Sequence, residues 1–277
     1  MDNGKEVVAK IPNLNAPRPP FTIASEVATM NFMCLKSMTG VQELRRLRWV
    51  LNSAEFILME KVNGVELQQV WPRMEVEDRR EVVKAVTTYQ KSWAFVTFDK
   101  YGSLYFTEDF NGKNVPSLVY TNEKGQRVED SRFVIGTSCD MFEYGRRAID
   151  FDRGAWSSLE EYHATIGHRE LARAQEPPYL PLGTIEQCLR FPALYSYEPT
   201  REEKIATSRS YLKLLKYVLP ADRSLGFSHL WHEALHAGNI LMDPNKILRM
   251  VTPLSEGARF AYCGFNESQS FRQAFHD

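Results

Sequence analysis

The sequence predicts an α+β protein with a small, sheet-containing N-terminal lobe and a larger, mainly helical C-terminal lobe. Before residue 61, two short apolar runs typical of strands flank one stretch with helical spacing. After it, long stretches with helical spacing dominate, and a polar break at Lys61–Gly64 separates the two parts. We therefore expect domains at residues 1–62 and 63–277.

The N-terminal lobe is expected to hold two strands and one helix. Glu6–Ile11 is a short apolar run that ends at a proline, which indicates a strand. Thr22–Leu35 carries apolar residues at helical spacing, and Phe56–Glu60 is a second apolar strand that a polar Asn-Gly pair follows. The prolines before the helix are expected in a loop (Pro17, Pro19 and Pro20).

The first part of the C-terminal lobe mixes a helix with short strands. Val76–Val96 is amphipathic, with charged residues crowding its start, so we expect a helix. Tyr101–Phe106 indicates a turn and a strand, and Phe133–Gly136 another strand. The polar stretch 110–131 is expected to be an exposed excursion.

Two capping boxes mark later helices. Ser157 with Glu160 predicts the start of a helix that runs to about Ala174. Thr200 with Glu203 predicts the start of a second, which ends before Pro220.

Composition excludes several classes of protein. The 34 basic and 35 acidic residues give a net charge of −1, which provides no footprint for nucleic acid or an anionic membrane. No apolar run approaches the roughly 18 residues that a membrane helix needs. Met1–Glu6 shows neither a signal-peptide core nor a transit peptide. The four cysteines are widely separated, which favours reduced thiols over a disulfide framework.

One segment admits two chemical interpretations. His232-Glu233-Ala234-Leu235-His236 matches H-E-x-x-H, in which two histidines on one helical face bind zinc and the glutamate activates water. Glu256 follows as a candidate third ligand. However, the Gly-Asn pair at 238–239 disfavours the long helix that this motif needs.

The second interpretation is a kinase-like catalytic loop. Aminoglycoside phosphotransferases and choline-kinase-like proteins carry a loop of the form H-x-D-x-x-x-x-N, and His232, Ala234 and Asn239 occupy its three positions. Upstream, Lys10 resembles the strand lysine that holds nucleotide phosphates, and Glu26 the helix glutamate that pairs with it. The stretch 56–64, including Glu60 and Val62, resembles the last strand of the small lobe and the hinge that meets adenine through its backbone.

The order of these pieces over most of residues 6–245 is similar to a fungal group in that superfamily, the altered inheritance of mitochondria protein nine group. Further similarity lies in the stretches 24–30, 59–67, 100–105 and 152–156. The resemblance implies a protein-kinase-like two-lobe fold that uses ATP and magnesium to phosphorylate a small-molecule hydroxyl. It also implies a mitochondrial location, where the sequence alone favours a cytoplasmic one.

The chain departs from the family pattern in ways that imply a catalytically impaired protein. Ala234 stands where the family has the aspartate that orients and deprotonates the acceptor, a loss that typically costs about 10²–10⁴ in rate. Residues 247–253 lack the expected magnesium-binding aspartate, which leaves Asn239 as the remaining candidate magnesium ligand. We also expect an incomplete N-terminal lobe and a truncated C-terminus, since only nine residues precede Lys10.

Structural roles remain open for the same residues. Lys10 can be a solvated strand-end lysine, Glu26 a carboxylate favoured by the helix dipole, and Asn239 a turn cap. His236 is expected to pack rather than to bind a ligand. A non-catalytic module that binds a small molecule or a protein partner on the same fold is therefore a competing hypothesis beside the zinc peptidase.

Overall fold

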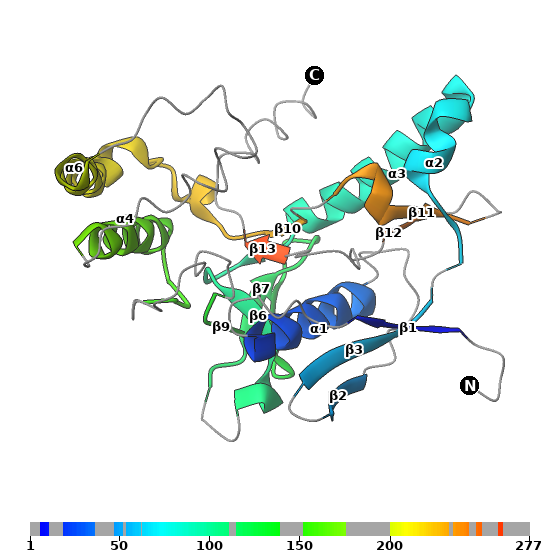
Figure 1. Cartoon of the computed structure of the whole chain (residues 1–277), viewed down its shortest axis with the longest axis horizontal. Coiled ribbons are helices and arrows are strands. Elements are labelled where there is room, and N and C mark those ends of the chain that lie inside the picture. Colours follow the sequence, from blue (N-terminus) through cyan, green and yellow to red (C-terminus); the bar gives the residue numbers. More distant parts are fainter. Residues whose placement is uncertain are drawn as a thin grey trace.

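The computed structural model of the chain describes residues 6–10, 19–36, 47–51, 54–61, 63–110, 115–138, 152–175, 200–232, 235–243, 248–250 and 260–262 (Figure 1). These residues form helices and antiparallel sheets, so the fold is mixed. Within these ranges no helix has the length and apolar character that crossing a bilayer requires.

The first sheet has the order β1-β3-β2. It consists of β1 (Val7–Lys10), β2 (Leu47–Leu51) and β3 (Ala54–Glu60), all antiparallel. The two strands that the sequence predicts in this lobe are therefore confirmed, and β2 completes the sheet. Helix α1 (Pro19–Leu35) lies beside this sheet (Figure 1). It begins at Pro19, earlier than predicted. A proline is compatible with the first turn of a helix, because backbone N–H groups in that turn have no partner within the helix and the N–H that proline lacks is not needed.

Helix α1 is the centre of the main hydrophobic core. Phe32 is fully buried, and its ring centroid lies 5.8 Å from that of Phe98, 5.3 Å from Tyr120 and 5.5 Å from Phe133. The same core includes Ile57 of β3. One core therefore spans both sides of residue 62, where the sequence places the lobe boundary.

A short strand and three helical segments follow the first sheet. They are β4 (Val65–Glu66), α2 (Leu67–Val70), the 3-10 helix η1 (Trp71–Arg73) and α3 (Val76–Phe95). The long helix predicted at 76–96 is confirmed, and buried Val82 and Trp93 attach it to the core.

The stretch predicted as an exposed excursion instead contains a hairpin, one strand of which packs into the core. β7 (Leu118–Thr121) pairs with β8 (Arg127–Asp130) and with β5 (Thr97–Phe98). β6 (Ser103–Phe106) pairs with β9 (Phe133–Gly136), and the 3-10 helix η2 (Thr107–Phe110) follows β6. Leu118 and Tyr120 alternate inward from β7, whereas the turn and Arg127 and Glu129 of β8 are exposed. The prediction was wrong for β7, because the stretch is polar in composition but apolar at every second position of that strand.

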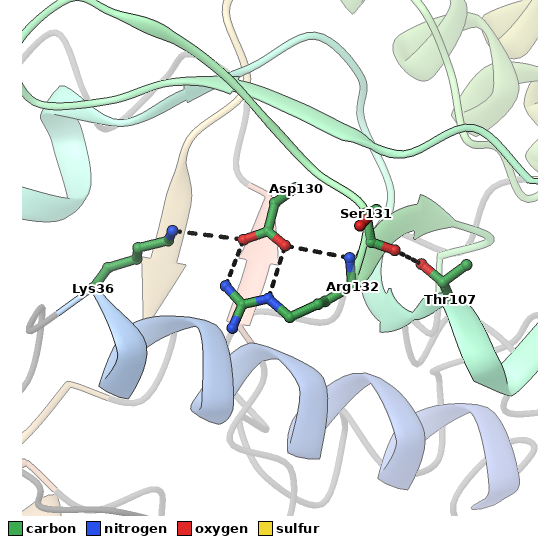
Figure 2. Close-up of polar contacts among 5 residues, drawn as sticks. All are labelled: Lys36, Thr107, Asp130, Ser131 and Arg132. Atoms are coloured by element: carbon green, nitrogen blue, oxygen red, sulfur yellow. Dashed lines mark hydrogen bonds and ion pairs between the residues drawn. The ribbon is translucent and has the colours of Figure 1, made fainter.

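A buried carboxylate fixes the end of this hairpin (Figure 2). Asp130 accepts hydrogen bonds from Arg132 Nε at 2.9 Å, from Nη2 at 2.7 Å and from its backbone N–H at 3.2 Å. Lys36, at the end of α1, lies 3.6 Å from the same carboxylate. Hydrogen bonds from Arg132 hold the pKa of Asp130 below its ordinary value, against the opposing effect of burial. The carboxylate thus attaches the hairpin to α1.

Two helices pair at the periphery of the molecule, away from the first sheet (Figure 1). They are α4 (Leu159–Gln175) and α6 (Arg201–Val218). The capping box that Thr200 and Glu203 predict is confirmed. The side-chain cap predicted at Ser157 lies at Ser158 instead, whose Oγ accepts from the Glu161 N–H at 3.1 Å. The Glu161 carboxylate accepts from the Ser157 N–H, so this cap is not a full capping box.

An aromatic cluster connects α4 to the strands. Tyr162 stacks on Tyr101 with centroids 5.6 Å apart and meets Trp156 edge-on at 5.3 Å. The Tyr101 hydroxyl donates to the Gly226 carbonyl, and burial raises the pKa of Tyr101 to about 12. Trp156 Nε1 donates to Asp152 at 2.9 Å, so the conspicuous Asp-Arg-Gly-x-Trp stretch has a structural role here.

Candidate functional site

The segment that carries the loop motif lies between two small sheets. After the 3-10 helix η4 (Arg223–Gly226), β10 (Leu230–His232) pairs with β13 (Phe260–Tyr262). The 3-10 turn η5 (Ala237–Asn239) leads into β11 (Ile240–Met242), which pairs with β12 (Leu248–Met250) on one side and β4 on the other. The loop is therefore held at both ends by strand pairing.

The pairing of β4 with β11 joins the strand that follows the predicted hinge to the strand that follows the predicted loop. Leu241 is the Cα partner of Glu66, and Met242 that of Val65. Gly64 has a φ of +153°, and a Cβ there would meet the Met242 carbonyl oxygen at 2.8 Å. Only glycine fits this approach without strain. Segments far apart in the sequence thus form one rigid junction.

His236 organises the loop rather than packing in the core. Its side chain is exposed, and Nδ1 accepts the Gly238 N–H at 3.2 Å, which caps η5. Its Nε2 lies 2.9 Å from the carboxamide nitrogen position of Asn239. When Nδ1 of a neutral histidine accepts a hydrogen bond, the ring proton is on Nε2. The Nε2–H of His236 then donates to the Asn239 carboxamide, provided that this group presents its oxygen to the ring. The expectation of a packing role for His236 was wrong, because the tight turn leaves the ring outside and pointed along the loop.

Asn239 is 6% exposed and sits where η5 meets β11. Its carboxamide is oriented by His236, so its position depends on the loop turn and not on a free side-chain rotation. Both the loop role and the turn role weighed from the sequence are compatible with this geometry.

Two polar residues beside the junction were missed by sequence reasoning. Gln68 Nε2 donates to Glu66 Oε2 at 2.6 Å, and α2, which carries Gln68, contacts η5. Hydrogen bonds from Gln68 and then Gln69 lower the pKa of Glu66. No local sequence pattern identifies these residues, because the pairing of β4 with β11 is what places them beside the loop.

The phosphate side of the predicted site is described mainly through its backbone. Lys10 ends β1 opposite Ile57, and Glu60 ends β3 opposite Val7. Glu26 lies in α1 and is 8% exposed. The order of lysine strand, glutamate helix and hinge strand matches the expectation. The Lys10 and Glu60 side chains fall outside what the structure describes, so the ion pair of Lys10 with Glu26 stays a prediction.

Four further candidate residues lie partly or wholly outside the described residues. Val62 and Ala234 are not described, and His232 is described only as the end of β10. Glu256 also lies outside them.

The backbone around the histidines bears on the zinc interpretation. His232 is in a strand, and His236 has an extended conformation with φ −131° and ψ 166°. Neither residue is therefore in the helical turn that aligns the histidines of H-E-x-x-H. In the described part of the chain, no three His, Cys, Asp or Glu side chains gather as a metal site.

Several proteins that this chain resembles are fungal. A subtelomeric hrmA-associated cluster protein of Aspergillus fumigatus is 33% identical over 157 residues, which cover 55% of this chain and 29% of that protein. The altered inheritance of mitochondria protein 9, mitochondrial, of Debaryomyces hansenii is 32% identical over 152 residues, covering 50% of this chain and 24% of the relative. The same-named protein of Lachancea thermotolerans is 26% identical over 254 residues, covering 80% and 39%.

These matches support the fungal altered inheritance of mitochondria protein 9-like group for this chain. The matched segments span only about a quarter to two fifths of the relatives' own length. No family model matches the chain. No solved structure matches it either.

Proposed function

We propose that this chain is a kinase-like protein of the aminoglycoside-phosphotransferase superfamily that binds a nucleotide but is impaired in phosphoryl transfer. The observation that carries the proposal is the pairing of β4 with β11, which holds the residues just after the hinge-like stretch 56–64 against the strand that follows the loop 232–239. A kinase site needs both segments at one place, since the hinge meets the base and the loop meets the reacting phosphate.

The first sheet provides further support for nucleotide binding. Its strand β1 ends at Lys10 and runs antiparallel to β3, which leads directly toward the hinge. Helix α1 lies against β3 and buries Glu26. A strand lysine fixed by a helix glutamate neutralises nucleotide phosphates in this class of site. We assign Lys10 that role, with Glu26 as the residue that positions it.

The residues present do not fit a complete magnesium site. Magnesium takes oxygen ligands in near-octahedral geometry, chiefly from carboxylates and phosphates. Asn239 has its carboxamide turned toward His236, and residues 247–253 contain no carboxylate to join it. We therefore propose nucleotide binding that depends little on magnesium.

Impaired transfer follows from the loop itself. Alanine at 234 has no group to orient or deprotonate an acceptor hydroxyl, and phosphoryl transfer relies on positioning and charge neutralisation. The chain is thus expected to bind a nucleotide without efficient transfer of its phosphate.

Calorimetric titration with ATP, with and without magnesium, tests the proposal. We expect binding that Lys10→Ala abolishes and that Lys84→Ala, a change of an exposed lysine on α3, leaves intact. No binding by the folded wild-type chain would overturn the nucleotide assignment and leave the competing hypothesis of a module without nucleotide. Turnover of ATP with a small-molecule acceptor, lost in Lys10→Ala, would overturn the impairment.

A mitochondrial location is part of the proposal, because relatives matched over half or more of this chain are named as mitochondrial proteins. Fractionation of cells expressing the natural full-length protein with a C-terminal tag tests it. Recovery in the cytosol alone would contradict the proposed location.

A further inference from the structure

Helices α4 and α6 form an antiparallel pair with its own internal contacts. A Cβ added at Gly167 of α4 would meet Leu212 Cδ2 of α6 at 2.7 Å, so the two helices approach closely at that point. Arg201, the first residue of α6, donates from Nε to the Ala174 carbonyl at 2.8 Å and from Nη2 to the Gln175 carbonyl. The start of α6 is therefore fastened to the end of α4.

The pair is packed apart from the main hydrophobic core. Among the residues that the structure describes, the extensive contacts of each helix are with the other one, and the main core contains no residue of either. The pair instead shares a smaller cluster, in which Tyr101, Trp156 and Leu159 are buried and Tyr162 and Leu219 pack against them. This cluster lies at the start of α4 and the end of α6. The attachment that the described residues provide is therefore at one end of the pair.

Backbone hydrogen bonds fix the chain on both sides of the pair. Before α4, Tyr101 and Trp156 exchange N–H···O bonds of 2.8 and 2.9 Å. After α6, the Phe98 N–H donates to the Ser228 carbonyl at 2.9 Å, and Ser228 is fully buried. Strand β10 and the loop 232–239 follow this fixed point. An opening of the helix pair therefore has boundaries near residues 156 and 228, and the loop lies outside them.

We propose that α4 and α6 are one cooperative unit, which unfolds reversibly while the main core stays folded. Most of the stability of a helix in water comes from tertiary packing, and for these helices of 17 and 18 residues that packing is mainly their contact with each other. Regions with few buried contacts to the core open at a lower free energy than the whole molecule. Because each helix provides the main packing surface of the other, the two open together.

Amide hydrogen exchange of the full chain, followed by mass spectrometry of peptides, tests the proposal. The slowest amides of α4 and α6 are expected to report one shared opening, with protection at least about tenfold lower than that of α1. This comparison shows whether the pair is a unit of lower stability, since α1 is the centre of the main core.

Two variants of the main core show whether the opening is separate from global unfolding. Asp130→Asn weakens the contact of the hairpin with α1, a contact that persists while the pair is open. Exchange in α1 is therefore expected to accelerate, whereas exchange in α4 and α6 stays as in the wild type. Val82→Ala, a truncation of a buried residue of α3, is a second variant with the same expectation. Acceleration of α4 and α6 equal to that of α1 in these variants would overturn the proposal.

Variants of Tyr162 show whether the two helices open together. Its ring stacks on that of Tyr101 with centroids 5.6 Å apart, so Tyr162→Ala weakens the attachment of the unit. Exchange is expected to accelerate by the same factor in both helices, about tenfold or more. Tyr162→Phe keeps the stacked ring and is the matched control, expected to exchange nearly as the wild type does. Circular dichroism shows whether each variant is folded.

Three other results would also contradict the unit. If α4 and α6 are protected as strongly as α1, the pair does not open separately. If their slowest amides differ in protection, or if Tyr162→Ala accelerates exchange in α4 alone, the two helices open independently of each other.

Discussion

Gly64 lies against the main-chain carbonyl of Met242, at a distance that leaves no space for a side chain. This contact fastens the hinge-like segment to β11, the strand that follows the loop. A residue with a side chain would be disfavoured at position 64 for two reasons. Its φ of +153° would be strained, and its Cβ would collide with the Met242 carbonyl. The junction is therefore sensitive to a single methyl group.

Gly64→Ala is expected to lower the free energy of unfolding by about 2–4 kcal/mol, from an unfavourable φ and a backbone clash together. Gly125→Ala is the matched control, since Gly125 has φ +73° but no atom within 4 Å of an added Cβ. It is expected to cost only about 1 kcal/mol. Urea unfolding measures both, and equal losses would show that the contact with Met242 contributes nothing.

Asp130→Asn is expected to destabilise the protein by about 2–3 kcal/mol, because it removes a charge that receives three hydrogen bonds from Arg132 in a largely buried place. Asp99→Asn is the control. Its partner Arg127 lies 2.8 Å away on the same hairpin, but both side chains are exposed, so the expected loss is under about 1 kcal/mol. Similar losses for both variants would contradict the role assigned to burial.

Acid is expected to weaken the same contact. The pKa of Asp130 is lower folded than unfolded, so its stabilising effect is complete above the unfolded value near 4 and is lost as pH falls through the lower folded value. Below about pH 4, unfolding free energy should decline more steeply in the wild type than in Asp130→Asn. If the unfolding free energies of the wild type and Asp130→Asn fall equally with pH, Asp130 does not contribute to acid sensitivity.

His163 predicts a second pH dependence, at the contact of α4 with α6. Its Nδ1 lies 3.3 Å from the Tyr211 hydroxyl, and burial lowers its pKa. The unfolded chain therefore binds the proton more readily, so stability is complete above about pH 6.5, falls below it and levels off once pH is below the folded pKa. His163→Gln should flatten this part of the profile in urea unfolding between pH 7 and 5. If the His163→Gln profile matches that of the wild type, a group other than His163 causes the pH dependence of stability in this range.

The cap of α4 separates sequence from structure directly. Ser158→Ala is expected to cost about 1 kcal/mol, because Ser158 Oγ accepts the Glu161 N–H. Ser157→Ala should have little effect, since Ser157 contributes its backbone N–H to Glu161 and not its side chain. Thermal unfolding of the two variants shows which serine caps the helix. A larger loss of stability in Ser157→Ala than in Ser158→Ala would favour the cap predicted from the sequence.

Elements whose signals are local could be predicted from the amino-acid pattern. Helix α3 follows from its apolar periodicity, the start of α6 from the Thr200 capping box, and β9 from its short apolar run. These features depend on residues within one or two turns of each other, so neighbouring side chains are enough to specify them.

Contacts across the folded chain bring distant residues to one place, and no local pattern predicts them. The burial of β7, the pairing of Glu66 with Leu241 and the orientation of Asn239 by His236 all depend on contacts between distant segments or on how the loop is folded. A polar stretch becomes core when alternate residues meet α1, and an ordinary glutamine becomes part of a site when β4 pairs with β11. Such contacts are selected by the packing of the whole chain, which local propensity does not encode.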